Sequence, residues 1–212
     1  MFSYVEDKEL RGDLRSACEE IITNVQKSFL RDYFTFQFKL IGSGDNRLIT
    51  QNGKNGEFDL DYNFILQKDK QGLINNPKKI KELFIDAFNE ANPKLGFNPA
   101  NNSHSVITSR LVIGGRLFFS FDVAIMCEGN NGNYYKIVYD KHSGRYLWNE
   151  VKSSRGYQEK MTVLKRIGKW PEIKDLYLYK KNMHLRNGDN IVSFSILLET
   201  LNELCNKYRI RV

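Results

Sequence analysis

The apolar residues at the start of the chain recur with the spacing of a helix. Between residues 10 and 30 they return every three or four positions, and charged residues occupy the other face. This spacing predicts a long amphipathic helix that packs on a core. Residues 34–40 then alternate apolar and polar side chains, which predicts a half-buried strand. That strand runs directly into Gly42-Ser43-Gly44.

A second strand and a crossover helix are predicted next. Residues 57–66 alternate apolar residues with Asp59, Asp61 and other polar residues, which is the period of a strand. Asn76 followed by Pro77 is a typical helix start, and apolar residues keep the helical period until Pro93.

Two further strands flank Gly114-Gly115, a pair typical of a hairpin turn. Residues 105–113 and 116–126 form its arms, and residues 134–139 predict one more short strand.

The end of the chain changes to a helical pattern. Residues 158–169 and 191–208 both have helical spacing, and Asp189 or Asn190 could cap the second helix. The sequence therefore predicts an α+β fold, with a sheet and its helices in residues 1–145 and a small helical lobe in residues 146–212.

Composition and charge describe an ordinary globular protein. Hydrophobic residues make up 41% and charged residues 27% of the chain, a balance that excludes a disordered protein. The net charge of +7 attracts polyanions such as triphosphates or RNA, although many soluble proteins are as basic.

Cysteines and apolar runs bear on the compartment. Cys18, Cys127 and Cys205 are far apart and lack the spacing of a zinc site or a disulfide framework. No run approaches the roughly 20 apolar residues that span a membrane. We therefore expect a cytoplasmic protein without a membrane partner.

Three aspartates carry the candidate chemistry. Residues two apart in a strand share a face, so Asp59 and Asp61 present two carboxylates side by side. Asp122 lies on the opposite face of its strand from the apolar residues around it. If the two strands pair, the three carboxylates converge. Such a cluster of oxygen ligands suits Mg²⁺ or Mn²⁺. Each feature alone is common, and a Gly-Ser-Gly after a strand is more often only a turn.

The order of these motifs resembles a known family. The segments "LIGSGDNRLITQNGKNGEFDLDYNFIL" and "LFFSFDVAIM" resemble the DNA polymerase β-like nucleotidyltransferase superfamily. The branch most similar in look contains the oligoadenylate synthetases, cyclic-dinucleotide synthases and poly(A) polymerases. The resemblance implies a mixed β-sheet flanked by helices. It also implies a nucleoside triphosphate held by Gly42 and Ser43, with two metal ions held by Asp59, Asp61 and Asp122.

A second match lies in the tail. The segments "VLKRIGKW" and "SFSILLETLNEL" resemble the helical part that supplies a phosphate-binding lysine and a serine in that branch, which implicates Lys165 and Ser193. The alternative is that Lys165 lies on a solvated helix face and Ser193 only occupies a first turn.

The leading hypothesis is therefore a metal-dependent nucleotidyltransferase that moves a nucleoside monophosphate to an acceptor hydroxyl and releases pyrophosphate. The acceptor could be RNA, a second nucleotide, a protein or a small molecule. The rival is a non-catalytic module of the same fold that binds RNA or a protein. We expect no catalysis by His104, His142 or His184, because none has metal-ligand spacing or a paired nucleophile.

Overall fold

The computed structural model describes residues 1–53, 56–151, 156–189 and 191–211. In chain order the elements are β1 (Phe2–Tyr4), α1 (Lys8–Lys27), η1 (Phe29–Asp32), β2 (Phe34–Ile41), α2 (Gly42–Asp45), β3 (Thr50–Asn52), β4 (Phe58–Asp69), α3 (Pro77–Ala91), η2 (Asn92–Leu95), β5 (Asn101–Asn102), β6 (Ile107–Ile113), β7 (Arg116–Glu128), β8 (Tyr134–Asp140), β9 (Arg145–Glu150), α4 (Tyr157–Arg166), α5 (Trp170–Asn187) and α6 (Ser193–Lys207).

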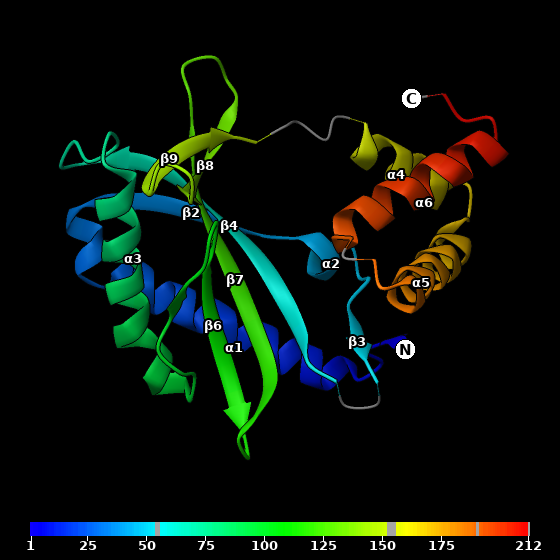
Figure 1. The fold of residues 1–212 in the computed structure, drawn as a ribbon, viewed down its shortest axis with the longest axis horizontal. Coiled ribbons are helices and arrows are strands. Elements are labelled where there is room, and N and C mark those ends of the chain that lie inside the picture. Colours follow the sequence, from blue (N-terminus) through cyan, green and yellow to red (C-terminus); the bar gives the residue numbers. More distant parts are fainter. Residues whose placement is uncertain (54–55, 152–155, 190, 212) are drawn as a thin grey trace.

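A mixed β-sheet forms the centre of the molecule (Figure 1). Its strands are ordered β2-β4-β7-β6-β5, and β8 and β9 extend it beyond the end of β7. β4 and β7 are parallel, whereas the other neighbouring pairs are antiparallel. Since parallel neighbours need a crossover connection, α3 fills the role predicted for it between the strands.

One face of the sheet is buried against α1 and α3. Phe58, Leu60 and Tyr62 are at most 5% exposed, as their alternation predicts. Phe119 and Phe121 on β7 join the same core, which the buried residues of α1 and α3 complete. Each large apolar side chain buried here stabilises the fold by about 1.5–3 kcal/mol. This packing determines which side chains of β4 and β7 face the core. The side chains that alternate with them point to the other face of the sheet.

The helices α4, α5 and α6 form a separate lobe on the other side of the sheet (Figure 1). Their core includes Leu164, Tyr177 and Leu201, and Leu48 from the segment before β3 packs into it. β1 joins the lobe as well, because Asn182 Oδ1 accepts from the Phe2 amide at 2.6 Å. The lobe is therefore tied to the sheet domain at both β1 and the β3 segment.

The predicted fold class is confirmed: a mixed sheet flanked by helices carries a C-terminal helical part. Some boundaries differ. β9 pairs with β8, so the sheet continues past residue 145, where we expected the lobe to begin. α5 was not predicted as a helix. Its buried residues, Ile173 and Tyr177, share the helix with apolar residues that are exposed, such as Tyr179 at 60%.

The start of α6 also differs from the sequence expectation. The helix begins at Ser193, and Val192 precedes it without a side-chain cap. Asp189 therefore does not cap this helix, and Asn190 lies outside the described residues. Within the residues that the structure describes, no helix combines the length and the apolar character needed to cross a lipid bilayer.

Candidate functional site

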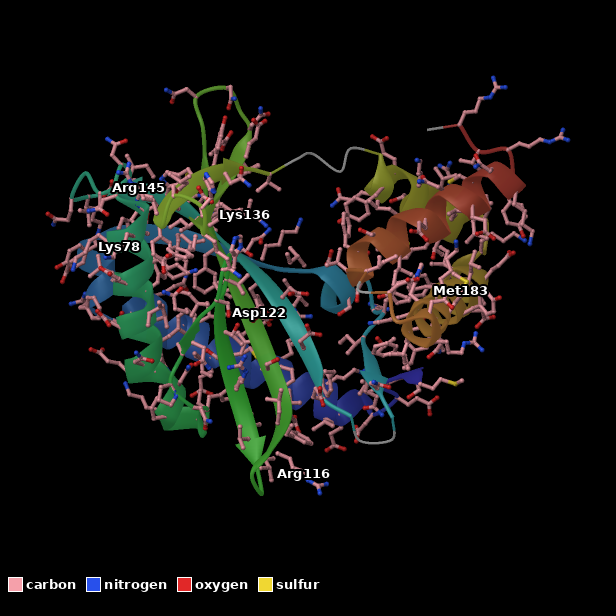
Figure 2. The ribbon with its side chains drawn as sticks, in the orientation of Figure 1. Lys78, Arg116, Asp122, Lys136, Arg145 and Met183 are labelled. Carbon is pink, nitrogen blue, oxygen red and sulfur yellow. The ribbon has the colours of Figure 1, made fainter. Side chains whose placement is uncertain are left out.

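The three aspartates meet on the face of the sheet opposite α1 and α3. In the parallel pairing of β4 and β7, Asp61 is in register with Asp122, and Asp59 with Ser120. Residues in register on neighbouring strands point to the same side, and the strands lie roughly 4.8 Å apart. The structure thus brings Asp59, Asp61 and Asp122 together, and Figure 2 shows Asp122 near the middle of the sheet.

Asp122 is held by the neighbouring strand. Thr108 on β6 is in register with it, and the Thr108 hydroxyl donates to Asp122 Oδ1 at 2.6 Å. Burial raises the pKa of the Asp122 carboxyl, while this hydrogen bond and the charge of Arg110 oppose the rise. One oxygen of Asp122 is therefore engaged by β6, and Oδ2 is the atom left for other chemistry.

Asp61 has the most strongly altered carboxyl of the three. Burial, followed by the negative charges of Asp59 and Asp122, raises the pKa of Asp61 to about 7. Such a rise means that the ionised form lacks compensation in the protein alone. Within the described part of the chain, no three His, Cys, Asp or Glu side chains form a group that could hold a metal ion by themselves. A cation here would need further oxygen ligands from outside the protein.

The glycine-serine turn packs directly on the Asp61 carboxylate. The backbone of Gly42 has φ +64°, and a Cβ at this position would lie 2.8 Å from Asp61 Oδ2. A side chain would therefore meet both left-handed strain and a carboxylate. The turn itself forms α2, a single helical turn that follows β2 directly.

A cavity of about 380 Å³ joins the turn, β4 and the helical lobe. Five of the predicted residues line it: Gly42, Ser43, Asp59, Asp61 and Ser193. A second cavity of about 430 Å³ adjoins it and shares Thr50, Asp59 and Lys181 with it. The sheet and the lobe therefore enclose the candidate site together.

Lys181, rather than the predicted Lys165, lines the two cavities. Lys181 on α5 lines both cavities, and its Nζ donates to Thr50 Oγ1 at 2.6 Å. Burial lowers the pKa of Lys181, and the charge of Asp59 opposes that change. Lys165 lies on α4, lines neither cavity, and places its Nζ 4.6 Å from the Trp170 ring centroid. No motif around Lys181 marks it in the sequence.

Solved structures provide the comparison with known proteins. No protein-family model and no curated protein sequence matches the chain. The cyclic AMP-GMP synthase DncV of Vibrio cholerae, in complex with a linear intermediate, superposes with a TM-score of 0.65 at 11% identity over 94% of this chain and 67% of that one. The c-di-GMP synthase CdnE of Capnocytophaga granulosa gives 0.59 at 16% identity, over 96% and 62%.

Two further solved structures extend the comparison. CdnC of Escherichia coli, solved with ATP, gives a TM-score of 0.55 at 15% identity over 94% of this chain and 61% of that one. CdnG of Bradyrhizobium diazoefficiens, solved with GTP, gives 0.52 at 13% identity over 72% and 40%. The chain thus spans only 40 to 67% of the length of these four structures. At such identities the likeness shows a common fold, the nucleotidyltransferase fold that the motifs indicated.

The raised pKa of Asp61 leads to a test of stability against pH. A carboxyl that is harder to ionise in the folded state destabilises that state once it is ionised, so the free energy of unfolding falls as pH rises from about 4 through 7. Without divalent cations, we expect Asp61→Asn to raise the free energy of unfolding by roughly 2–4 kcal/mol at pH 8 and to change it little at pH 4. Urea titrations at both pH values measure this, with exposed Asp13→Asn as the control. Equal stability of wild type and Asp61→Asn at pH 8 would contradict the electrostatic picture.

The close packing of Gly42 on Asp61 leads to a second test. Gly42 and Gly114 both have positive φ, +64° and +59°, but only Gly42 has a neighbour within 4 Å of its added Cβ. We expect Gly42→Ala to destabilise the protein by about 1 kcal/mol more than Gly114→Ala. In an Asp61→Ala background this difference should shrink, which urea titrations of the four variants measure. A difference that persists without the Asp61 carboxylate would show that the contact is unimportant.

Proposed function

We propose that the protein is a metal-dependent nucleotidyltransferase that transfers a nucleoside monophosphate from a nucleoside triphosphate to an acceptor hydroxyl and releases pyrophosphate. The observation that carries the proposal is the composition of the 380 Å³ cavity. The Gly42-Ser43 turn, two carboxylates of β4 and a lysine of the lobe line one space. This combination matches what a triphosphate and its cations require.

The phosphate side of the cavity contains hydroxyl and ammonium donors. Ser43 comes from α2, Lys181 from α5 and Ser193 from the first turn of α6. Because no side chain caps α6, its first amide groups and the positive end of its dipole are available to an anion. We therefore place the triphosphate between Ser43, Lys181 and Ser193.

The carboxylate side fits magnesium or manganese. Mg²⁺ binds through one or two carboxylates and completes its shell with phosphate oxygens and water. Asp59 and Asp61 line the cavity, and the uncompensated charge of Asp61 favours a cation there. Asp59, Asp61 and Asp122 would hold the ions together with the triphosphate. When bound, such ions polarise the phosphate and stabilise the leaving pyrophosphate.

The protein's own groups then account for the transfer. The acceptor oxygen forms a bond to the α-phosphorus as the bond from that phosphorus to the β-phosphate oxygen breaks. The acceptor proton passes to Asp122 Oδ2, the oxygen that does not accept from Thr108. Lys181 and Ser43 hold the leaving pyrophosphate, and the ammonium offsets its charge.

The proposal is tested by following the α-phosphate. The protein is incubated with each α-labelled triphosphate and Mg²⁺ or Mn²⁺, alone and with cellular RNA or protein. We expect label on a nucleotide, RNA, protein or small-molecule acceptor, with an equal amount of pyrophosphate released. The rival binding module would instead be stabilised by RNA regardless of metal, with no label transferred and no pyrophosphate released from any triphosphate.

The carboxylates of β4 provide the first functional prediction. We expect Asp59→Asn and Asp61→Asn each to lower turnover by about 100-fold or more, because the metal-bound transition state loses a ligand. Folding should be retained, since both side chains lie opposite the apolar face of β4. Turnover at saturating Mg²⁺ and a thermal melt measure the two effects. Near-normal turnover in either variant would contradict the assignment.

The two lysines provide a matched pair. We expect Lys181→Met to weaken the binding of a non-hydrolysable nucleoside triphosphate by about tenfold or more, because a charge-assisted contact to phosphate is lost. Lys165→Met should leave that affinity unchanged, because Lys165 lines neither cavity. Titration calorimetry in Mg²⁺ decides between them. The reverse result would restore Lys165 to the site and remove Lys181.

A further inference from the structure

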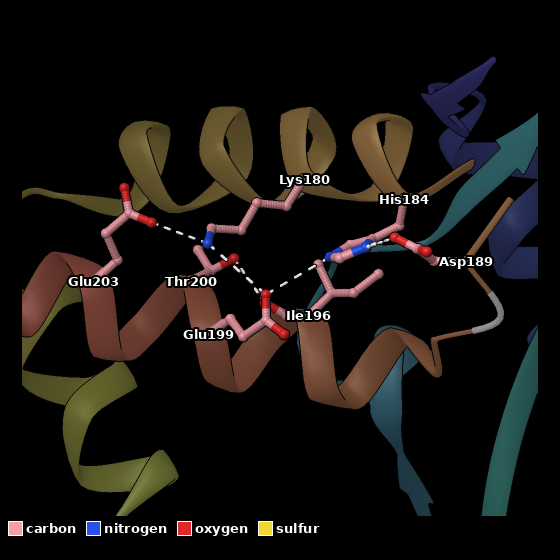
Figure 3. A network of polar contacts seen from close by, with 7 residues as sticks. All are labelled: Lys180, His184, Asp189, Ile196, Glu199, Thr200 and Glu203. Carbon is pink, nitrogen blue, oxygen red and sulfur yellow. Dashed lines mark hydrogen bonds and ion pairs between the residues drawn. The ribbon is translucent and has the colours of Figure 1, made fainter. Parts of the chain in front are cut away.

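A cluster of charged side chains joins α5 to α6 next to the candidate site (Figure 3). At its centre is His184, whose side chain is only 12% exposed. Its Nδ1 lies 2.9 Å from Asp189 Oδ2, and its Nε2 lies 3.7 Å from Glu199 Oε2. Lys180, one turn earlier on α5, lies 2.9 Å from Glu203 and 3.8 Å from the same oxygen of Glu199.

The contacts of His184 differ between its two protonation states. The short contact to the Asp189 carboxylate requires a proton on Nδ1, because a carboxylate can only accept. In neutral histidine Nε2 then carries a lone pair, and this buried atom has no hydrogen-bond partner. Nε2 then faces the Glu199 carboxylate oxygen, and neither atom has a hydrogen to donate. Protonation of Nε2 would turn this contact into an attractive one and leave His184 paired with both acids.

His184 contacts both ends of the connection between α5 and α6. Asp189 directly follows Gly188, whose left-handed backbone at φ +72° ends α5, and the Asp189 amide donates to the His184 carbonyl oxygen. Glu199 belongs to α6, whose first residue is Ser193. His184 also lies one turn after Lys181 on α5. Stronger contacts at His184 therefore hold Lys181 and Ser193, the proposed phosphate-binding residues of the lobe, in a fixed position relative to each other.

We propose that His184 is a positioning residue: its protonation, through Asp189 and Glu199, tightens the connection between α5 and α6 that carries Lys181 and Ser193. Only the consequence for nucleotide binding depends on the proposed function. The charged groups around the ring are Asp189 and Glu199, which it contacts, and Lys180 and Lys181 on its own helix. Glu57 and Asp59 of the β4 segment line the same cavity as His184 and add negative charge.

The inference is tested by amide hydrogen exchange of the whole chain without nucleotide. The amides of Ser195 and Ile196 donate to the Val192 carbonyl oxygen, so they report opening at the start of α6. Between pH 8 and pH 5.5 we expect their protection, corrected for intrinsic rates, to rise about threefold more in wild type than in His184→Gln. Glutamine can still donate to Asp189 but cannot gain a charge. The control is His142→Gln, at an exposed position in the β8–β9 turn, which should behave as wild type.

Comparison with His184→Gln separates the effect of His184 from the effects of other titrating groups, because a group such as Asp61 contributes equally to the pH dependence of both proteins. Identical pH dependence in wild type and His184→Gln would overturn the inference. The affinity for a non-hydrolysable triphosphate in Mg²⁺, measured at the same pH values, then tests the link to function. If exchange depends on His184 while affinity does not, the positioning contact stands, and the placement of the triphosphate at Ser193 in the proposed function fails.

Discussion

The parallel pairing of β4 and β7 is the constraint on which the site depends. Aromatic and aliphatic residues of both strands fill one face, so the register that buries Leu60 and Phe121 also aligns Asp61 with Asp122 on the other. A shift of one residue in this register would preserve neither the buried core nor the aligned aspartates, because it would move every side chain of the strand to the opposite face. The core thus enforces a crowding of like charges at a partly buried site, and burial together with that crowding raises the pKa of Asp61. A cation would offset the crowded negative charge.

The helical lobe supplies what the sheet lacks. The residues of β4 that line the 380 Å³ cavity are both acids, whereas α5 and α6 offer Lys181, Ser193 and an uncapped helix start. The lobe is anchored by Leu48, which precedes β3, and by β1 at the chain's beginning. These anchors make the cavity a product of long-range packing. Contacts inside the lobe, such as those of His184, can therefore influence the geometry of the proposed phosphate site.

Much of the sheet could be predicted from the sequence because its elements have clean periods. β2, β4, α1 and α3 begin and end within three residues of their predicted limits, since one face of each is buried and the other is not. Gly42, Ser43, Asp59 and Asp61 could be placed because they follow directly from those periods and one turn. Lys181 could not, because its place in the site depends on Thr50, which is 131 residues away in sequence. α5 was missed because its apolar residues do not form one buried stripe.

We infer that the fold crowds carboxylates so that a cation and a triphosphate complete the site. The most direct measurement is the titration of the Asp61 carboxyl by carbon NMR, in wild type and with Mg²⁺ and a non-hydrolysable nucleoside triphosphate. We expect a pKa of about 7 for Asp61 in the protein alone. We expect that pKa to fall below the ordinary value of an aspartate when both ligands are bound. An ordinary pKa in the free protein, or a raised pKa that the ligands leave unchanged, would contradict this inference.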